Sequence, residues 1–250
     1  MPTPHEVSDY VHPVMLEGLN HLGDAYGDER YWYEVVLQDE RPENRWRALL
    51  VLAARGYPDA RPDLADESYH ENSRIRAWAC FAMGASRQRL FRGDLERHSG
   101  DPVRRVRFRA YRALAALGFD PNILPVAGED NLTVLISDDD EAARETIAGI
   151  LREAGIPCTT AATVEETVAK AASLSPAIVV TDNQKGADNT AGLHMAARFA
   201  RDRHLQAITL VMLSDDRVGG PFLWYGGDHY LHKTRDLKHL VPLVNLLLRV

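Results

Sequence analysis

Apolar positions in the first half of the chain recur with a period of 31 residues. The register is set by three equally spaced arginines, Arg45, Arg76 and Arg107. Small or apolar side chains follow each arginine at offsets of three, six and seven residues: Ala48, Ala79 and Ala110; Val51, Ala82 and Ala113; Leu52, Met83 and Leu114. These offsets share one face of a helix. The pattern therefore predicts three related amphipathic helices.

The same period links Arg30, Arg61 and Arg92, which predicts a shorter helix upstream of each arginine-led helix. Each unit is then a helical hairpin. A single hairpin cannot bury its own apolar face, so successive units are expected to stack and form a shared core. The amphipathic stretch 7–22 is predicted to cap the open end of the stack.

In the second half, short apolar runs alternate with helical patterns. Strands are predicted at 133–136, near Cys158, and at 177–180, 208–213 and 229–231; helices are predicted at 141–154, 164–174, 193–203 and at the C-terminal end. Such alternation is typical of a parallel sheet covered on both faces. The glycine-rich segment 217–227 predicts a shortened fourth helix.

Two prolines and a glycine between residues 119 and 131 break both the repeat period and any helix. We therefore place a domain boundary there, with a helical repeat domain at 1–126 and an α/β domain at 127–250. The usage of basic residues changes across it, because all four lysines lie in the second domain.

Composition excludes several classes of protein. The chain is 45% hydrophobic and 26% charged, which is typical of a soluble globular protein. No apolar run is long enough to cross a bilayer, and the N-terminus lacks the basic and apolar regions of a signal peptide. We therefore expect a cytoplasmic protein without a membrane partner. The net charge of −7 disfavours a chain that coats nucleic acid with its whole surface.

Chemically active side chains stand where the predicted strands end. Asp138 and Asp139 follow the first strand, Asp182 the third, Ser214 the fourth and Lys233 the fifth. The carboxyl ends of parallel strands meet at one edge of the sheet, so these side chains are expected to converge. Crowded carboxylates repel one another and call for a divalent cation, and Mg²⁺ prefers a few carboxylates together with water.

These strand ends resemble the receiver domains of two-component response regulators. The resemblance is carried by Val134-Leu-Ile-Ser-Asp-Asp-Asp, Ser175-Pro-Ala-Ile-Val-Val-Thr-Asp, Val211-Met-Leu-Ser and Gly227-Asp-His-Tyr-Leu-His-Lys. It implies that Asp182 accepts a phosphoryl group, with Ser214 and Lys233 contacting that group and Tyr230 as the switch aromatic. It also implies Mg²⁺ ligands, namely Asp138, Asp139, Asp182 and the Gln184 backbone carbonyl.

The second domain departs from the receiver pattern near the implied phosphorylation site. Asp215 stands where a small residue is usual, and Thr234 replaces the usual proline. An extra carboxylate at position 215 would slow phosphorylation or repel the phosphate, and the threonine would remove the usual cis bond or make it costly. The alternative of a phosphorylation-inert receiver therefore stays open.

The helical units resemble short HEAT-like repeats of the kind found in phycobilisome-lyase-type proteins, over about residues 30–120. The resemblance rests on Val106-Arg-Phe-Arg-Ala-Tyr-Arg-Ala-Leu-Ala-Ala-Leu-Gly118 and Ile75-Arg-Ala-Trp-Ala-Cys-Phe-Ala-Met-Gly84. It implies a protein-binding scaffold. Segment 72–112 holds eleven arginines and three acids, and a patch for a polyanion or partner would comprise Arg74, Arg87, Arg89, Arg104, Arg105, Arg109 and Arg112. The favoured interpretation is structural, with Arg45, Arg76 and Arg107 paired to acids between units.

The sequence thus predicts an all-α HEAT-like solenoid followed by a flavodoxin-like, doubly wound, five-stranded parallel sheet. The leading hypothesis is a response regulator, without a separate catalytic domain, that is phosphorylated by a histidine kinase or phosphotransfer protein and whose repeats bind an unknown protein. Two alternatives remain: a constitutive scaffold with an inert receiver, and nucleic-acid binding through the arginine-rich segment.

Overall fold

The computed structural model describes residues 37–55, 61–119 and 132–249. The chain divides into two compact units, with the described residues up to 119 in one and those from 132 onward in the other. The predicted boundary at 126/127, the predicted cap at 7–22 and the upstream helix at Arg30 lie outside the described residues and stay predictions. No helix in the described part of the chain combines the length and apolar character needed to span a membrane.

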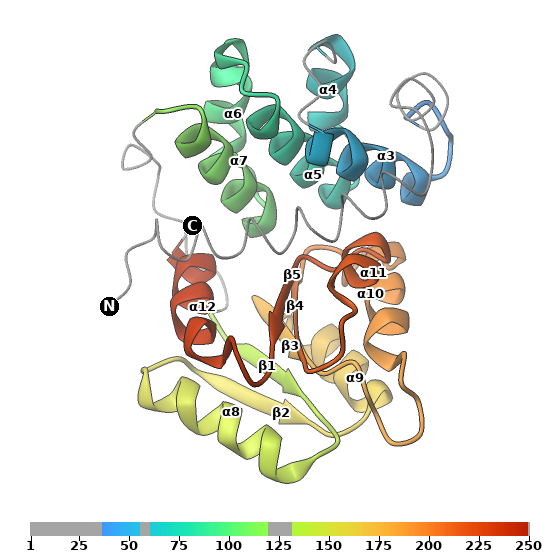
Figure 1. The fold of residues 1–250 in the computed structure, drawn as a ribbon, viewed down its shortest axis with the longest axis vertical. Helices are drawn as coiled ribbons and strands as arrows, with labels where there is room; N and C mark the ends of the chain where they lie inside the picture. Colours follow the sequence, from blue (N-terminus) through green and yellow to red (C-terminus); the bar gives the residue numbers. More distant parts are fainter. Residues whose placement is uncertain (1–36, 56–60, 120–131, 250) are drawn as a thin grey trace. The chain divides into compact units, whose positions relative to one another are not determined.

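The first unit is a stack of helical hairpins (Figure 1). Its helices are α3 (Pro42–Arg55), α4 (Arg61–Ser68), α5 (Ser73–Ala85), the 3₁₀ turn η2 (Arg89–Phe91), α6 (Arg92–His98) and α7 (Arg104–Ala116). The longer helices α3, α5 and α7 pack against one another in that order, while α4 packs on α5 and α6 on α7. The predicted alternation of shorter and longer helices is therefore confirmed for the second and third units.

Residues at the predicted 31-residue spacing lie in the core of this unit. Ala48, Ala79 and Ala110 are fully buried. Such small side chains let the helix axes approach closely. The approach is close at Gly84 of α5, where an added Cβ would lie 2.8 Å from the Cα and Cβ of Ala113 in α7. The repeated small positions in the sequence are thus explained by contact between helices of successive hairpins.

The second unit is a five-stranded parallel sheet with helices on both faces. Its strands are β1 (Val134–Ser137), β2 (Cys158–Ala161), β3 (Ile178–Thr181), β4 (Thr209–Ser214) and β5 (His229–His232). The strand order is β2-β1-β3-β4-β5, and every neighbouring pair is parallel. This is the flavodoxin-like order, which confirms the predicted fold class.

The helices of this unit are α8 (Glu141–Glu153), α9 (Val164–Leu174), α10 (Ala191–Arg201), α11 (Gly219–Trp224), the 3₁₀ turn η4 (Leu237–His239) and α12 (Leu240–Arg249). One core cluster joins alternate strand residues such as Leu135, Val179 and Met212 to α9, α10 and α11. Helices α8 and α12 lie on the other face of the sheet (Figure 1). With six residues, α11 is the predicted short fourth helix.

Candidate functional site

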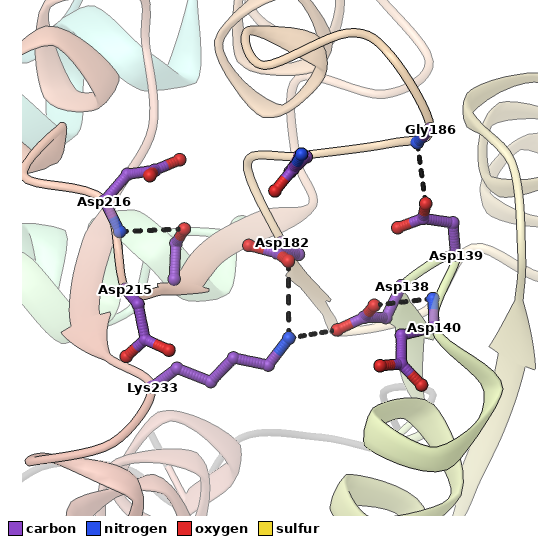
Figure 2. A pocket seen from close by; sticks show the side chains of 10 residues that line it. Asp138, Asp139, Asp140, Asp182, Gly186, Asp215, Asp216 and Lys233 are labelled. Carbon is purple, nitrogen blue, oxygen red and sulfur yellow. Dashed lines mark hydrogen bonds and ion pairs between the residues drawn. The ribbon is translucent and has the colours of Figure 1, made fainter.

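Strand register brings the predicted site residues together at the carboxyl edge of the sheet. Ser137 of β1 is paired with Thr181 of β3, so Asp138 and Asp182, the residues that follow them, leave the sheet side by side. Ser214 is likewise paired with His232, which Lys233 follows. The resulting pocket is lined by Asp138, Asp139, Asp140, Asp182, Gln184, Gly186, Ser214, Asp215, Asp216 and Lys233 (Figure 2).

Lys233 bridges two carboxylates across this pocket. Its Nζ donates to Asp138 Oδ2 at 2.7 Å and to Asp182 Oδ2 at 3.3 Å (Figure 2). Burial opposes the charge on the lysine, but the hydrogen bond to Asp138 and the attraction of both carboxylates raise the pKa of Lys233 above its ordinary value. Lys233 is therefore a fixed cation whose charge acts directly on Asp182.

The two carboxylates after Asp138 have different surroundings. Asp139 is exposed, and its Oδ2 accepts a hydrogen bond of 2.6 Å from the Gly186 N–H. Burial of Asp139 works against ionisation, yet this backbone hydrogen bond helps to hold its pKa below the ordinary value. Asp140 caps the N-terminus of α8 by accepting from the Ala142 and Ala143 N–H groups. Only Asp140 therefore takes the capping role that acidic residues commonly have before a helix.

Asp215 is turned toward the loop after β5. Its Oδ1 accepts hydrogen bonds from the Thr234 N–H at 3.0 Å and the Thr234 hydroxyl at 2.7 Å, and it lies 3.1 Å from His232 Nδ1. Chiefly because of the Thr234 hydroxyl, the pKa of Asp215 is lowered, so the carboxylate stays ionised at neutral pH. The peptide bonds of the described residues are all trans, including the one before Thr234. Through the two hydrogen bonds from Thr234, Asp215 joins the end of β4 to the loop after β5.

Tyr230 faces inward from β5. The residue is 7% exposed, and its hydroxyl donates to the main-chain oxygens of Ser214, at 3.1 Å, and of Asp216. The Ser214 side chain is 2% exposed, and its Oγ accepts a hydrogen bond of 3.4 Å from the Asp216 N–H. The Tyr230 hydroxyl is thus hydrogen-bonded both to the end of β4 and to the loop that follows it.

Lys185 is a charged residue of the site that the sequence analysis did not single out. It is 9% exposed, and its Nζ donates at 2.8 Å to the main-chain oxygen of Ser137. Burial lowers the pKa of Lys185, against the attraction of Asp138, Asp182 and Asp139. Its only signal in the sequence was its position three residues after Asp182.

Residues 134–245 match the family model of the response regulator receiver domain, and residues 30–115 match the model of HEAT repeats. Residues 134–245 are a response regulator receiver domain. Residues 30–115 are HEAT repeats.

Among curated proteins, the receiver domain is similar to the phosphate regulon transcriptional regulatory protein PhoB of Pseudomonas aeruginosa. The two are 30% identical over 122 residues, which span 47% of this chain and 52% of the relative. The chain thus matches about half the length of that relative.

Solved structures with a similar fold include the chemotaxis response regulator CheY4 of Vibrio cholerae, at 19% identity and a TM-score of 0.42, with 47% of this chain and 99% of that chain covered. A two-component response regulator from Clostridium difficile is 24% identical, with a TM-score of 0.41 and coverage of 47% and 96%.

Receiver domains in general bind Mg²⁺ at the phosphorylation site, and the donor chemistry of this one fits that ion. Its pocket is lined by six aspartates and one lysine. Oxygen ligands with excess negative charge suit a hard divalent cation. Within the described residues, however, no three Asp, Glu, His or Cys side chains are already grouped as metal ligands. Asp138 and Asp139 instead accept hydrogen bonds from Lys233 and Gly186.

In the HEAT repeats, the structure supports the structural interpretation of the register arginines. Arg45 pairs with Glu67, and Arg76 Nε lies 2.9 Å from Asp101 Oδ2. Arg107 differs, because its Nη1 donates to the main-chain oxygens of Asp101 and Pro102. Two register positions thus carry the predicted ion pairs between helices, and the third binds the backbone of the turn before α7.

The predicted arginine patch is largely internal. Four of its seven members, Arg74, Arg104, Arg105 and Arg109, are buried, whereas Arg87 and Arg89 are exposed and Arg112 is half-buried. The guanidinium of Arg109 lies 4.4 Å from the centroid of the Trp78 ring. Such stacking stabilises a buried cation within the unit. The seven arginines therefore do not form one continuous exposed surface, and a role for them in binding a polyanion or partner stays a prediction.

Proposed function

We propose that this chain is a two-component response regulator whose receiver domain is phosphorylated on Asp182. The single observation that carries the proposal is the Lys233 bridge, which holds an ammonium 3.3 Å from Asp182 Oδ2 in a pocket that Ser214 also lines. The family match supports it, because a receiver domain implies a histidine kinase or phosphotransfer partner in general.

In the proposed reaction, an oxygen of the Asp182 carboxylate attacks the phosphorus of the donor. The bond from phosphorus to the donor's leaving atom breaks, and the leaving atom keeps the bonding electron pair. Lys233 offsets the charge of the transferred group, and the Ser214 hydroxyl donates to one of its oxygens. Asp138, Asp139, Asp182 and the Gln184 carbonyl would hold Mg²⁺, which when bound offsets negative charge on the phosphoryl oxygens.

The switch is proposed to run from Ser214 to Tyr230. A phosphoryl group that recruits the Ser214 hydroxyl would move the end of β4 and the loop after it, whose main-chain oxygens accept from the Tyr230 hydroxyl. The aromatic ring would then change its packing beside Gly219, where an added Cβ would lie 3.1 Å from the Tyr230 ring. Phosphorylation of Asp182 would in this way alter the packing of the Tyr230 ring against α11.

The test is the intact mass of the full chain after incubation with a small phosphodonor such as acetyl phosphate. We expect a mass increase of one phosphoryl group that requires Mg²⁺, is lost on acid treatment and is absent from Asp182→Asn. An Asp215→Ala variant is the matched control for the extra carboxylate, and it should be modified at least as fast as the unaltered chain. If the adduct persists in Asp182→Asn, the proposed phosphoacceptor is wrong.

The HEAT repeats are proposed to bind a protein partner in a manner that depends on phosphorylation. Two large apolar side chains at the surface of this unit, Tyr69 at 49% and Leu90 at 52% exposure, offer contacts for such a partner. Coupling can be tested without knowing the partner, by hydrogen exchange of α3 to α7 with and without beryllofluoride. Changed exchange in these helices supports phosphorylation-dependent output, and unchanged exchange supports independent units.

A constitutive scaffold with an inert receiver is the second candidate. It is favoured by one observation, the absence of a ready-formed group of metal ligands among the described residues. In that case the receiver would give no Mg²⁺-dependent adduct, and partner binding would be the same for the unaltered chain and for Asp182→Asn.

A further inference from the structure

Lys185 is buried in the receiver domain, in the loop that follows β3. Its main chain forms a two-residue bridge with Asp188, with Lys185 N to Asp188 O at 2.9 Å and Asp188 N to Lys185 O at 3.1 Å. Its Nζ donates to the main-chain oxygen of Ser137, the last residue of β1. Because Asp138 and Asp139 directly follow Ser137, the ammonium lies beside the backbone from which these two acids leave β1.

The Lys185 ammonium forms no ion pair with a described carboxylate. Among the described residues no carboxylate lies within salt-bridge distance of its Nζ, whose hydrogen bond goes to a neutral main-chain oxygen. Lys233, in contrast, is within 3.3 Å of two carboxylates. Asp138, Asp182 and Asp139 still attract the Lys185 ammonium through the protein interior. The positive charge of Lys185 therefore acts on all three carboxylates, although it forms an ion pair with none of them.

A buried ammonium beside metal ligands opposes a second cation. Removing an ammonium from water is costly unless nearby negative charge compensates it. The acids around Lys185 supply this compensation, and the same acids are those proposed to hold Mg²⁺. Two cations that depend on one set of carboxylates repel each other, and the repulsion is larger for a divalent ion because the energy scales with the product of the charges.

We propose that Lys185 is an internal counter-cation that weakens Mg²⁺ binding by this receiver domain and so raises the Mg²⁺ concentration needed for phosphorylation. The inference rests on the proposed function, because it takes the three acids as the Mg²⁺ ligands. It assigns Lys185 a tuning role: the residue touches neither the phosphoryl group nor the metal.

The test is Mg²⁺ binding to the full chain, measured by isothermal titration calorimetry. Lys185→Met keeps the length and apolar stem of the side chain and removes its charge; we expect it to bind Mg²⁺ about tenfold more tightly than the unaltered chain. Lys185→Arg keeps the charge and should stay within about twofold of the unaltered chain. Lys238→Met removes an exposed charge from η4 and should change the affinity by less than about twofold.

A second neutral variant keeps the test valid if Lys185→Met does not fold. Lys185→Gln retains a donor for the Ser137 oxygen, and it should tighten Mg²⁺ binding in the same direction if far-UV circular dichroism shows a folded domain. Unchanged or weaker affinity in both neutral variants overturns the inference, while the phosphoryl adduct on Asp182 would still support the proposed function. Absence of Mg²⁺ binding in every variant overturns both.

Discussion

In the HEAT repeats, Arg45, Arg76 and Arg107 each meet an acceptor inside the unit, whereas the pocket of the receiver domain collects six aspartates and one lysine. The first arrangement satisfies each arginine locally, through an ion pair or through main-chain oxygens, and so stabilises the helical stack. The second leaves an excess of negative charge at one edge of a sheet, where it can be offset by a ligand. Charge that is paired locally indicates structure, and charge that is left in surplus indicates a binding site.

Among variants that test this comparison, Arg76→Ala is expected to lower the free energy of unfolding most. The Arg76 side chain is 14% exposed and that of its partner Asp101 is 6% exposed, so removal of the arginine leaves a buried carboxylate without its ion pair. We expect the repeat unit to lose about 3 kcal/mol of unfolding free energy. Urea denaturation with hydrogen exchange, which assigns the transition to the repeats, measures this loss.

The matched control is Arg152→Ala in the receiver domain. Arg152 and Glu145 form an ion pair in which both side chains are more than half exposed. Its loss should cost less than about 1 kcal/mol. Equal losses in Arg76→Ala and Arg152→Ala would remove the distinction between buried and exposed pairs.

A second, smaller effect is expected from Gly84→Ala at the contact of α5 with α7. The new methyl group would lie 2.8 Å from two atoms of Ala113, so the helices must move apart, at a cost of about 2 kcal/mol. An added Cβ at Gly93 in α6 meets no atom within 4 Å, so Gly93→Ala should be neutral or stabilising. Melting temperatures of the two variants give the comparison, and a stable Gly84→Ala would contradict the close packing.

Acid should weaken the repeats through Asp101. Burial alone would raise the pKa of this carboxyl, but the His98 ring, Arg76 and the Val103 N–H lower it to about 2. A lowered folded pKa means that the contribution to stability is complete above the unfolded value of about 4 and is lost as the pH falls toward 2. Urea midpoints of the repeat unit should fall through this window, and less steeply in Asp101→Asn; parallel curves would show that Asp101 does not contribute.

The smallest stability effect is expected from Asp182→Asn in the receiver domain. The Asp182 contact with Lys233 is 3.3 Å long, and Lys233 keeps its shorter bond to Asp138 when Asp182 is neutralised. The unfolding free energy should change by less than about 1 kcal/mol. A loss as large as that of Arg76→Ala, measured by urea denaturation, would mean that Asp182 is a structural residue.

Much of this architecture was predictable from the sequence because it depends on periodicity. The 31-residue spacing gave the hairpins that begin at Arg61 and Arg92, and these are where α4 and α6 begin. The strand ends gave Asp138, Asp182 and Lys233, since register in a parallel sheet follows from the fold. Both predictions use spacing along the chain, which sequence records directly.

What could not be predicted depends on side-chain direction. The carboxylate of Asp215 lines the pocket, where the sequence placed an extra acid, but its hydrogen bond to Thr234 in the next loop had no signal in the sequence. Arg105 and Arg109 were assigned to a surface patch but are buried. Lys185 gave no periodic signal because it lies in a loop. In each case the outcome is set by contacts between segments distant in sequence, which no local pattern encodes.

The central claim, that the receiver pocket is a working phosphorylation site, is tested most directly by beryllofluoride binding to the full chain, followed by ¹⁹F NMR. The account predicts a bound signal that requires Mg²⁺ and is lost in Asp182→Asn, together with a shift of the Tyr230 ring resonances. No bound signal from the unaltered chain at saturating Mg²⁺ and beryllofluoride would contradict it.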